Sequence, residues 1–215
     1  MAIMKLYNAD LSPFTTRIRM QIRAKGLEND IELVARPEGD AFKAISPTGK
    51  VPCLDTGASF HLPESETIAE YIEDSWPEPS LRGHTALSKA KVRLMSRFVD
   101  LYLMPGFSIL FGQMNPAARD DAKVKEGTEK VAAALGLIAS HIEGPLYAID
   151  RRLTLADCAL VPGLFFATNV GMAFGVGLNT APAALAYYDR IITDDEQAKR
   201  AVAEMGVALA TFSRR

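Results

Sequence analysis

A serine directly before a proline offers the most distinctive chemistry in the sequence. Ser12 precedes Pro13, and the pair is typical of a helix start, because serine caps backbone N–H groups and proline loses no hydrogen bond there. A hydroxyl at a helix N-terminus can also donate to an anion such as a thiolate sulfur, and the helix dipole favours the negative charge. Both roles are open, and the chemistry of the residues alone favours capping.

A second helix start offers chemistry of the same kind. Glu64-Ser65 comes directly before apolar residues at helical spacing, and acidic residues stand in the first turn, where the helix dipole favours them. Free backbone N–H groups and a serine hydroxyl suit a carboxylate ligand, whereas Glu64 suits an ammonium group. The alternative is plain helix capping.

Several other chemistries are disfavoured by residue type and spacing. Cys53 and Cys158 stand far apart without a CxxC pair, which argues against a disulfide framework and favours a reducing compartment. His61, His84 and His141 are scattered in spacings that do not suit a metal site. The net charge is −2, and the sequence lacks the dense cluster of basic residues that nucleic-acid binding needs.

The first 80 residues predict a mixed α/β unit that would position these groups. A strand at 3–7, a helix from Pro13 to Lys25 and a strand at 31–34 form a βαβ unit with parallel strands. Short strands at 51–55 and 59–62, joined by a glycine turn, predict a hairpin before the Glu64 helix.

The remaining residues predict an all-helical unit. A proline-rich linker at 76–80 coincides with a change in charge, because residues 1–80 hold 8 Lys and Arg against 13 Asp and Glu, and the rest 16 against 13. The two parts therefore carry about −5 and +3. The predicted helices are listed here in order: 86–114 with an interruption at Pro105-Gly106, 117–142, one from Thr154, 181–192 and 195–212.

An uncharged stretch from Cys158 to Leu178 raises the question of a membrane span. Pro162 and several glycines break it near the middle, so a buried core helix is the preferred interpretation. Residues 1–11 lack the basic and apolar regions of a signal peptide. We therefore expect a cytoplasmic protein without a membrane partner.

Together, four segments resemble the cytosolic glutathione S-transferase family, in particular its serine-type classes. They are Leu6-Tyr7 with Ser12 to Arg19, Ser46 to Leu54, Leu62 to Ile72, and Leu153 to Asp157. The resemblance implies a thioredoxin-like α/β N-terminal domain that binds glutathione (1–80), followed by an all-α helical bundle domain for the acceptor substrate (81–215). It also implies a homodimer, and the scattered histidines already argue for no metal.

The resemblance assigns roles to particular residues. It reverses the preference at Ser12, which becomes the residue that stabilises the glutathione thiolate, with Tyr7 as the rival. The cysteines of a dithiol redox motif are missing at this Ser-Pro-Phe-Thr segment. Val51-Pro52 resembles a cis-proline turn whose backbone pairs with the cysteinyl part of glutathione. The other implied glutathione-binding residues are Phe14, Lys50, Glu64 and Ser65.

The resemblance also suggests an activity. The main prediction is a detoxification enzyme in which the thiolate attacks a small, largely apolar electrophile. Alternatives are a glutathione-dependent isomerase, dehalogenase or ether-cleaving lyase, or a non-catalytic glutathione-binding protein. The candidate acceptor pocket comprises Leu11, Phe107, Leu110, Phe111 and Met114, although such apolar spacing is also typical of a core. Thr154 and Asp157 are interpreted as a capping box that starts a buried helix.

Overall fold

The computed structural model describes residues 3–212 and divides into two compact units. Of the described residues, those up to Leu81 and those from Gln197 onward form the first unit, and Arg82–Glu196 form the second. The first break lies beside the predicted linker. The C-terminal helix α9 (Glu196–Phe212) belongs with the first unit, although it follows the second in sequence.

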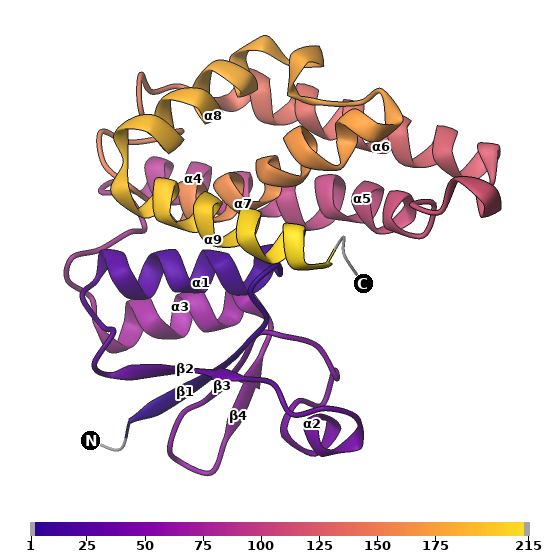
Figure 1. Cartoon of the computed structure of the whole chain (residues 1–215). Coiled ribbons are helices and arrows are strands. Elements are labelled where there is room, and N and C mark those ends of the chain that lie inside the picture. The colour runs from indigo at the N-terminus through magenta and orange to yellow at the C-terminus, as the bar shows by residue number, and fades with distance from the viewer. Residues whose placement is uncertain (1–2, 213–215) are drawn as a thin grey trace. The chain divides into compact units, whose positions relative to one another are not determined.

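The first unit is a four-stranded mixed sheet with helices (Figure 1). Its elements are listed here in chain order: β1 (Met4–Asn8), α1 (Pro13–Ala24), β2 (Ile31–Ala35), α2 (Asp40–Ile45), β3 (Cys53–Asp55), β4 (His61–Pro63) and α3 (Ser65–Ser75). The strand order is β2-β1-β3-β4, with β1 and β2 parallel and the β3–β4 hairpin antiparallel. The predicted thioredoxin-like N-terminal fold is confirmed.

Helices α1 and α3 lie side by side across one face of this sheet, and α9 runs along α1 (Figure 1). Leu6 and Leu54 from the strands and Ile18, Ile68 and Ile72 from the helices are completely buried. Burial of such side chains contributes roughly 1.5 to 3 kcal/mol each. The apolar spacing of the two helices thus gives the unit its core.

A buried ion pair fixes the end of the first unit. The Lys25 ammonium lies 3.0 Å from a Glu73 carboxylate oxygen and donates to the Pro79 carbonyl at 2.6 Å. The other Glu73 oxygen accepts from the Leu81 N–H at 3.0 Å. The bonds to Pro79 and Leu81 therefore hold the end of the proline-rich linker against α1 and α3. The two buried charges also pair with each other, as buried charges require.

The second unit is helical, as predicted, and holds no strand among its described residues. Its α-helices are listed here: α4 (Ala86–Phe98), α5 (Met104–Phe111), α6 (Asp121–His141), α7 (Leu155–Asn169) and α8 (Pro182–Asp194). The predicted interruption at Pro105 is wrong. A π-helical turn, Val99–Leu103, joins α4 to α5 without a break, and the Met104 N–H donates to the Val99 carbonyl. The wider turn gives room to the proline ring.

The capping box of α7 is confirmed. The Asp157 carboxylate accepts from the Thr154 N–H at 2.8 Å and from the Thr154 hydroxyl at 2.9 Å across the first turn, and residues 155–167 of the helix are all buried. The helix continues through Pro162, where the sequence suggested a break. At 15 residues it is shorter than the about 17 to 25 residues of a membrane span.

A different stretch meets the length and composition of a span among residues 3–212. The continuous helical run Ala86–Phe111 has 26 residues, and its most apolar window has a mean hydropathy of 1.3. Half of that window is buried inside the structure. A core helix meets the same criteria, so one such helix is weak evidence for a membrane segment.

Candidate active site

The strand register brings three predicted segments to the same end of the sheet. Tyr7 of β1 pairs with Cys53 of β3, and Cys53 pairs with Pro63 of β4. The loop to Ser12 leaves β1 at this end, Pro52 directly precedes Cys53, and Glu64 directly follows Pro63. Groups that are 40 or more residues apart in the sequence therefore converge.

Ser12 is the N-cap of α1, with Pro13 at the first helical position. Its hydroxyl oxygen accepts from the Thr15 N–H at 3.4 Å, which is long for such a bond. No described residue accepts the hydroxyl proton of this half-buried side chain. The weak cap therefore leaves the hydroxyl able to donate to a ligand.

Tyr7 is half-buried and packs with its ring against Phe42 of α2, with the ring centroids 5.9 Å apart. This contact gives the Tyr7 ring a packing role. The preference for Ser12 over Tyr7 as the residue that stabilises an anion stays a prediction.

The Val51–Pro52 peptide bond is cis, in agreement with the expected turn. Val51 is half-buried and Pro52 is buried directly before β3. The neighbouring Lys50 side chain is exposed. The backbone of Val51 thus stands beside the first residue of an antiparallel strand, where an extended ligand could pair with it.

Glu64 and Ser65 stand at the start of α3, as predicted. Glu64 occupies the N-cap with φ 71° and ψ 111°, and its side chain makes no capping hydrogen bond within the described chain. A left-handed φ costs about 1 to 3 kcal/mol outside glycine and is often found at functional sites. Glu64 is exposed and Ser65 is buried. Because Ser65 is the first residue of α3, its hydroxyl lies beside the free backbone N–H groups of the first turn.

An ion pair that the sequence did not indicate joins the two helix starts. Arg17 of α1, with 3% of its side chain exposed, lies 3.2 Å from the Glu66 carboxylate of α3. The same guanidinium stands 5.6 Å from the ring centroid of Phe14, which is half-buried. Arg17 and Glu66 are 49 positions apart, so no local pattern in the sequence indicates that they pair.

The predicted acceptor residues differ in exposure. Phe107 and Leu110 are fully buried within the helical unit, whereas Phe111 and Met114 are 39% and 46% exposed. Leu11, in the first unit, is half-buried. An acceptor pocket built from these residues stays a prediction, and the two exposed side chains suit it best. No cluster of three or more metal-ligating His, Cys, Asp or Glu side chains occurs among residues 3–212.

Family models match both parts of the chain. The glutathione S-transferase N-terminal domain matches residues 11–75, and the C-terminal domain matches residues 98–195. A maleylpyruvate isomerase from a Ralstonia species is 34% identical over 74% of this chain and 80% of its own length. The chain belongs to the glutathione S-transferase family.

Two further members of the family are similar over most of their length. A maleylacetoacetate isomerase from Pseudomonas aeruginosa is 29% identical to this chain over 79% of the chain and 84% of its own length. A solved structure of a maleyl pyruvate isomerase, a bacterial zeta-class member, superposes with a TM-score of 0.74. It is 29% identical and covers 92% of this chain and 95% of its own.

Proposed function

We propose that this chain is a glutathione-dependent enzyme in which the Ser12 hydroxyl stabilises the glutathione thiolate. The observation that carries the proposal is the free hydroxyl proton of Ser12 at the N-terminus of α1. A free thiol has a pKa near 8.5, so about a few per cent is ionised at pH 7. A hydroxyl donor and the helix dipole both favour the thiolate, and each pKa unit requires about 1.4 kcal/mol of preferential stabilisation.

Glutathione has groups that suit the rest of this sheet end. The cysteinyl backbone would pair with Val51 at the Pro52 turn, and the γ-glutamyl carboxylate would accept from Ser65 and the first turn of α3. Glu64 would face the γ-glutamyl ammonium, and Lys50 would face the other carboxylate. In this proposal residues 1–80 bind glutathione and residues 81–215 shape the acceptor site.

The thiolate can serve two reactions. In conjugation, sulfur attacks an electrophile and remains bonded to it. In glutathione-dependent isomerisation, sulfur adds to a conjugated alkene, the bond beside it rotates, and sulfur leaves again. The maleylpyruvate and maleylacetoacetate isomerases among the relatives make isomerisation the second candidate.

Binding and product analysis test the proposal. Calorimetry should show glutathione binding to the wild-type protein. Mass spectrometry then separates the two reactions, because a conjugate contains the mass of glutathione, whereas an isomer keeps the mass of its substrate and consumes no glutathione. A panel of arylating electrophiles and cis-alkene dicarboxylates provides the substrates. Absence of glutathione binding would contradict the proposal.

Ser65→Ala should weaken glutathione binding. A hydrogen bond to a charged group contributes about 1.5 to 3 kcal/mol, so the dissociation constant should rise about 10- to 150-fold. Turnover at saturating glutathione should change less, because the Ser12 hydroxyl is untouched. Titration calorimetry measures the change, with Ser75→Ala at the exposed far end of the same helix as the control. Equal glutathione affinity in the two variants would show that Ser65 does not bind glutathione.

A homodimer in the cytoplasm completes the proposal. The oppositely charged halves of the chain, about −5 and +3, would let two copies associate around a two-fold axis. Sedimentation without detergent should therefore give a mass near twice 23.4 kDa. A mass of a single chain would contradict the dimer, and partition into membranes would contradict the location.

A further inference from the structure

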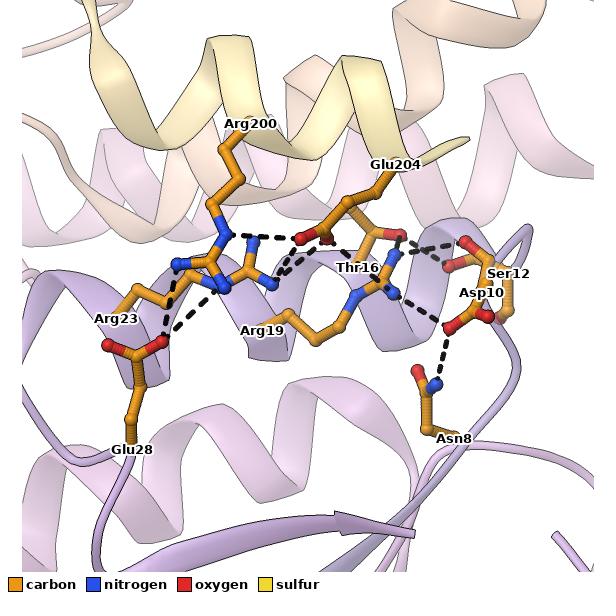
Figure 2. Close-up of polar contacts among 9 residues, drawn as sticks. All are labelled: Asn8, Asp10, Ser12, Thr16, Arg19, Arg23, Glu28, Arg200 and Glu204. Atoms are coloured by element: carbon orange, nitrogen blue, oxygen red, sulfur yellow. Dashed lines mark hydrogen bonds and ion pairs between the residues drawn. The ribbon is translucent and has the colours of Figure 1, made fainter. Parts of the chain in front are cut away.

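A buried guanidinium holds the backbone on both sides of Ser12. Arg19 lies on α1, and 3% of its side chain is exposed. Its Nη2 donates to the Asp10 carbonyl at 2.9 Å and to the Thr16 hydroxyl at 2.7 Å, and its Nη1 donates to the Asp10 carboxylate at 3.1 Å (Figure 2). One side chain therefore ties the loop before Ser12 to the helix turn after it.

Thr16 extends this contact to Ser12 itself. A guanidinium can only donate, so the Thr16 oxygen accepts from Arg19 and its own proton is free for the Ser12 carbonyl, 3.0 Å away. The Ser12 N–H donates to the Ala9 carbonyl at 2.9 Å. Both backbone polar groups of Ser12 are thus held, while its hydroxyl proton is not.

The C-terminal helix supplies counter-charge to Arg19. Glu204 of α9 lies 3.7 Å from Arg19 Nη1, and it accepts from Arg23 Nη2 at 2.7 Å and from Arg200 Nε at 3.1 Å (Figure 2). Burial lowers the pKa of the Arg19 guanidinium, and Glu204 and Asp10 oppose that shift. A buried charge needs such compensation, so α9 stabilises the charged state of the group that holds the Ser12 loop.

We infer that Arg19 is a positioning residue for Ser12, and that Thr16 relays its hold while Glu204 of the C-terminal helix keeps it charged and oriented. The inference rests on the proposed function. A misplacement of about 1 Å in a reacting arrangement can cost about 10²-fold in rate. The three side chains therefore act on the thiolate through Ser12, without contact with glutathione.

Thr16→Val is the sharpest variant, because it keeps the shape of the side chain and removes the hydroxyl that bridges Arg19 to Ser12. Ultraviolet absorbance of bound glutathione across pH gives the pKa of its thiol. We expect that pKa to rise by about one unit. At pH values below the pKa, kcat should fall about tenfold, because one unit changes the thiolate fraction tenfold there. The affinity for glutathione, measured at a pH below the thiol pKa of both bound forms, should stay within about twofold of the wild type, because Ser65 is unchanged and only the thiolate form loses stabilisation. Thr16→Ser restores the hydroxyl and should restore both values.

Two variants on the same network provide a second measurement. Arg19→Lys keeps the charge but cannot reproduce a planar fork that bonds three acceptors, so it should raise the thiol pKa at least as much as Thr16→Val. Glu204→Gln should raise it less, because Asp10 still pairs with Arg19. Arg200→Gln is the control. Its guanidinium also pairs with Glu204 but makes no contact with Asp10 or Thr16, so the thiol pKa should match the wild type.

The outcomes separate this inference from the proposed function. If wild-type protein binds glutathione without lowering its thiol pKa, the proposed role of Ser12 fails and the inference fails with it. If the wild type lowers that pKa and Thr16→Val and Arg19→Lys lower it equally, the network is structural and the inference alone is overturned. A raised pKa in those two variants, with rescue by Thr16→Ser, supports the inference.

Discussion

Ser12→Ala should lower turnover about 10² to 10⁴-fold, the range for loss of one stabilising donor or acid–base group. The hydroxyl stands at the N-terminus of α1, and its proton has no acceptor among the described residues. Alanine removes that donor, so less of the bound glutathione is thiolate at neutral pH. Steady-state kinetics at saturating glutathione measures the effect, and absorbance of the bound thiolate identifies its cause.

Two controls separate this role from helix capping. Loss of a serine cap costs about 0.5 to 2 kcal/mol of stability, and the long 3.4 Å bond from the Thr15 N–H places Ser12 toward the lower end. Urea unfolding of Ser12→Ala measures this loss independently of turnover. Tyr7→Phe should be mild, because the ring packs against Phe42 in either form. If Tyr7→Phe lost more turnover than Ser12→Ala, the thiolate role would belong to Tyr7.

Asp157→Ala should destabilise the helical unit by roughly 3 to 5 kcal/mol, because buried donors left without acceptors cost about 1 to 3 kcal/mol each. The completely buried carboxylate accepts from the Ala148 N–H at 2.8 Å, the Thr154 N–H at 2.8 Å and the Tyr187 hydroxyl at 2.9 Å. It joins the start of α7 to the preceding loop and to α8. Urea unfolding measures the loss.

An exposed first-turn carboxylate supplies the matched control. Asp121→Ala at the start of α6 removes a favourable interaction with the helix dipole, which contributes about 0.3 to 1 kcal/mol. Asp157→Ala should therefore lose several times as much as Asp121→Ala. Comparable losses would show that Asp157 acts only as a helix-start charge.

The pH dependence of stability provides an independent measurement at Asp157. Burial raises the pKa of its carboxyl from 3.8 to about 6, against the opposing effect of its hydrogen bonds. The folded state therefore binds the proton more tightly than the unfolded state, so stability falls as pH rises from about 4 to about 6. The advantage of the wild type over Asp157→Asn, which cannot titrate, should shrink by up to about 3 kcal/mol over that range. A constant difference would place the folded pKa near its unfolded value.

The sequence alone predicted the features that depend on neighbouring residues. The Ser12-Pro13 start of α1, the β3–β4 hairpin and the Thr154–Asp157 box were all legible, because a cap or a tight turn is made by residues within a few positions of each other. The order of the elements then indicated a thioredoxin-like unit followed by a helical one. The assignment of the Ser12 and Ser65 regions to one site came from the family resemblance.

The tertiary structure decided what depends on distant residues. The packing of Tyr7 on Phe42, the Arg17–Glu66 pair and the Arg19–Glu204 pair join positions 35, 49 and 185 residues apart, for which a single sequence carries no local signal. The left-handed backbone of Glu64 also escapes prediction, because a residue that strongly prefers other conformations adopts it only where its surroundings impose it. Likewise the π-helical turn Val99–Leu103, which joins α4 to α5 and gives room to Pro105, escapes prediction, because a proline in an apolar helical pattern also suits a helix end.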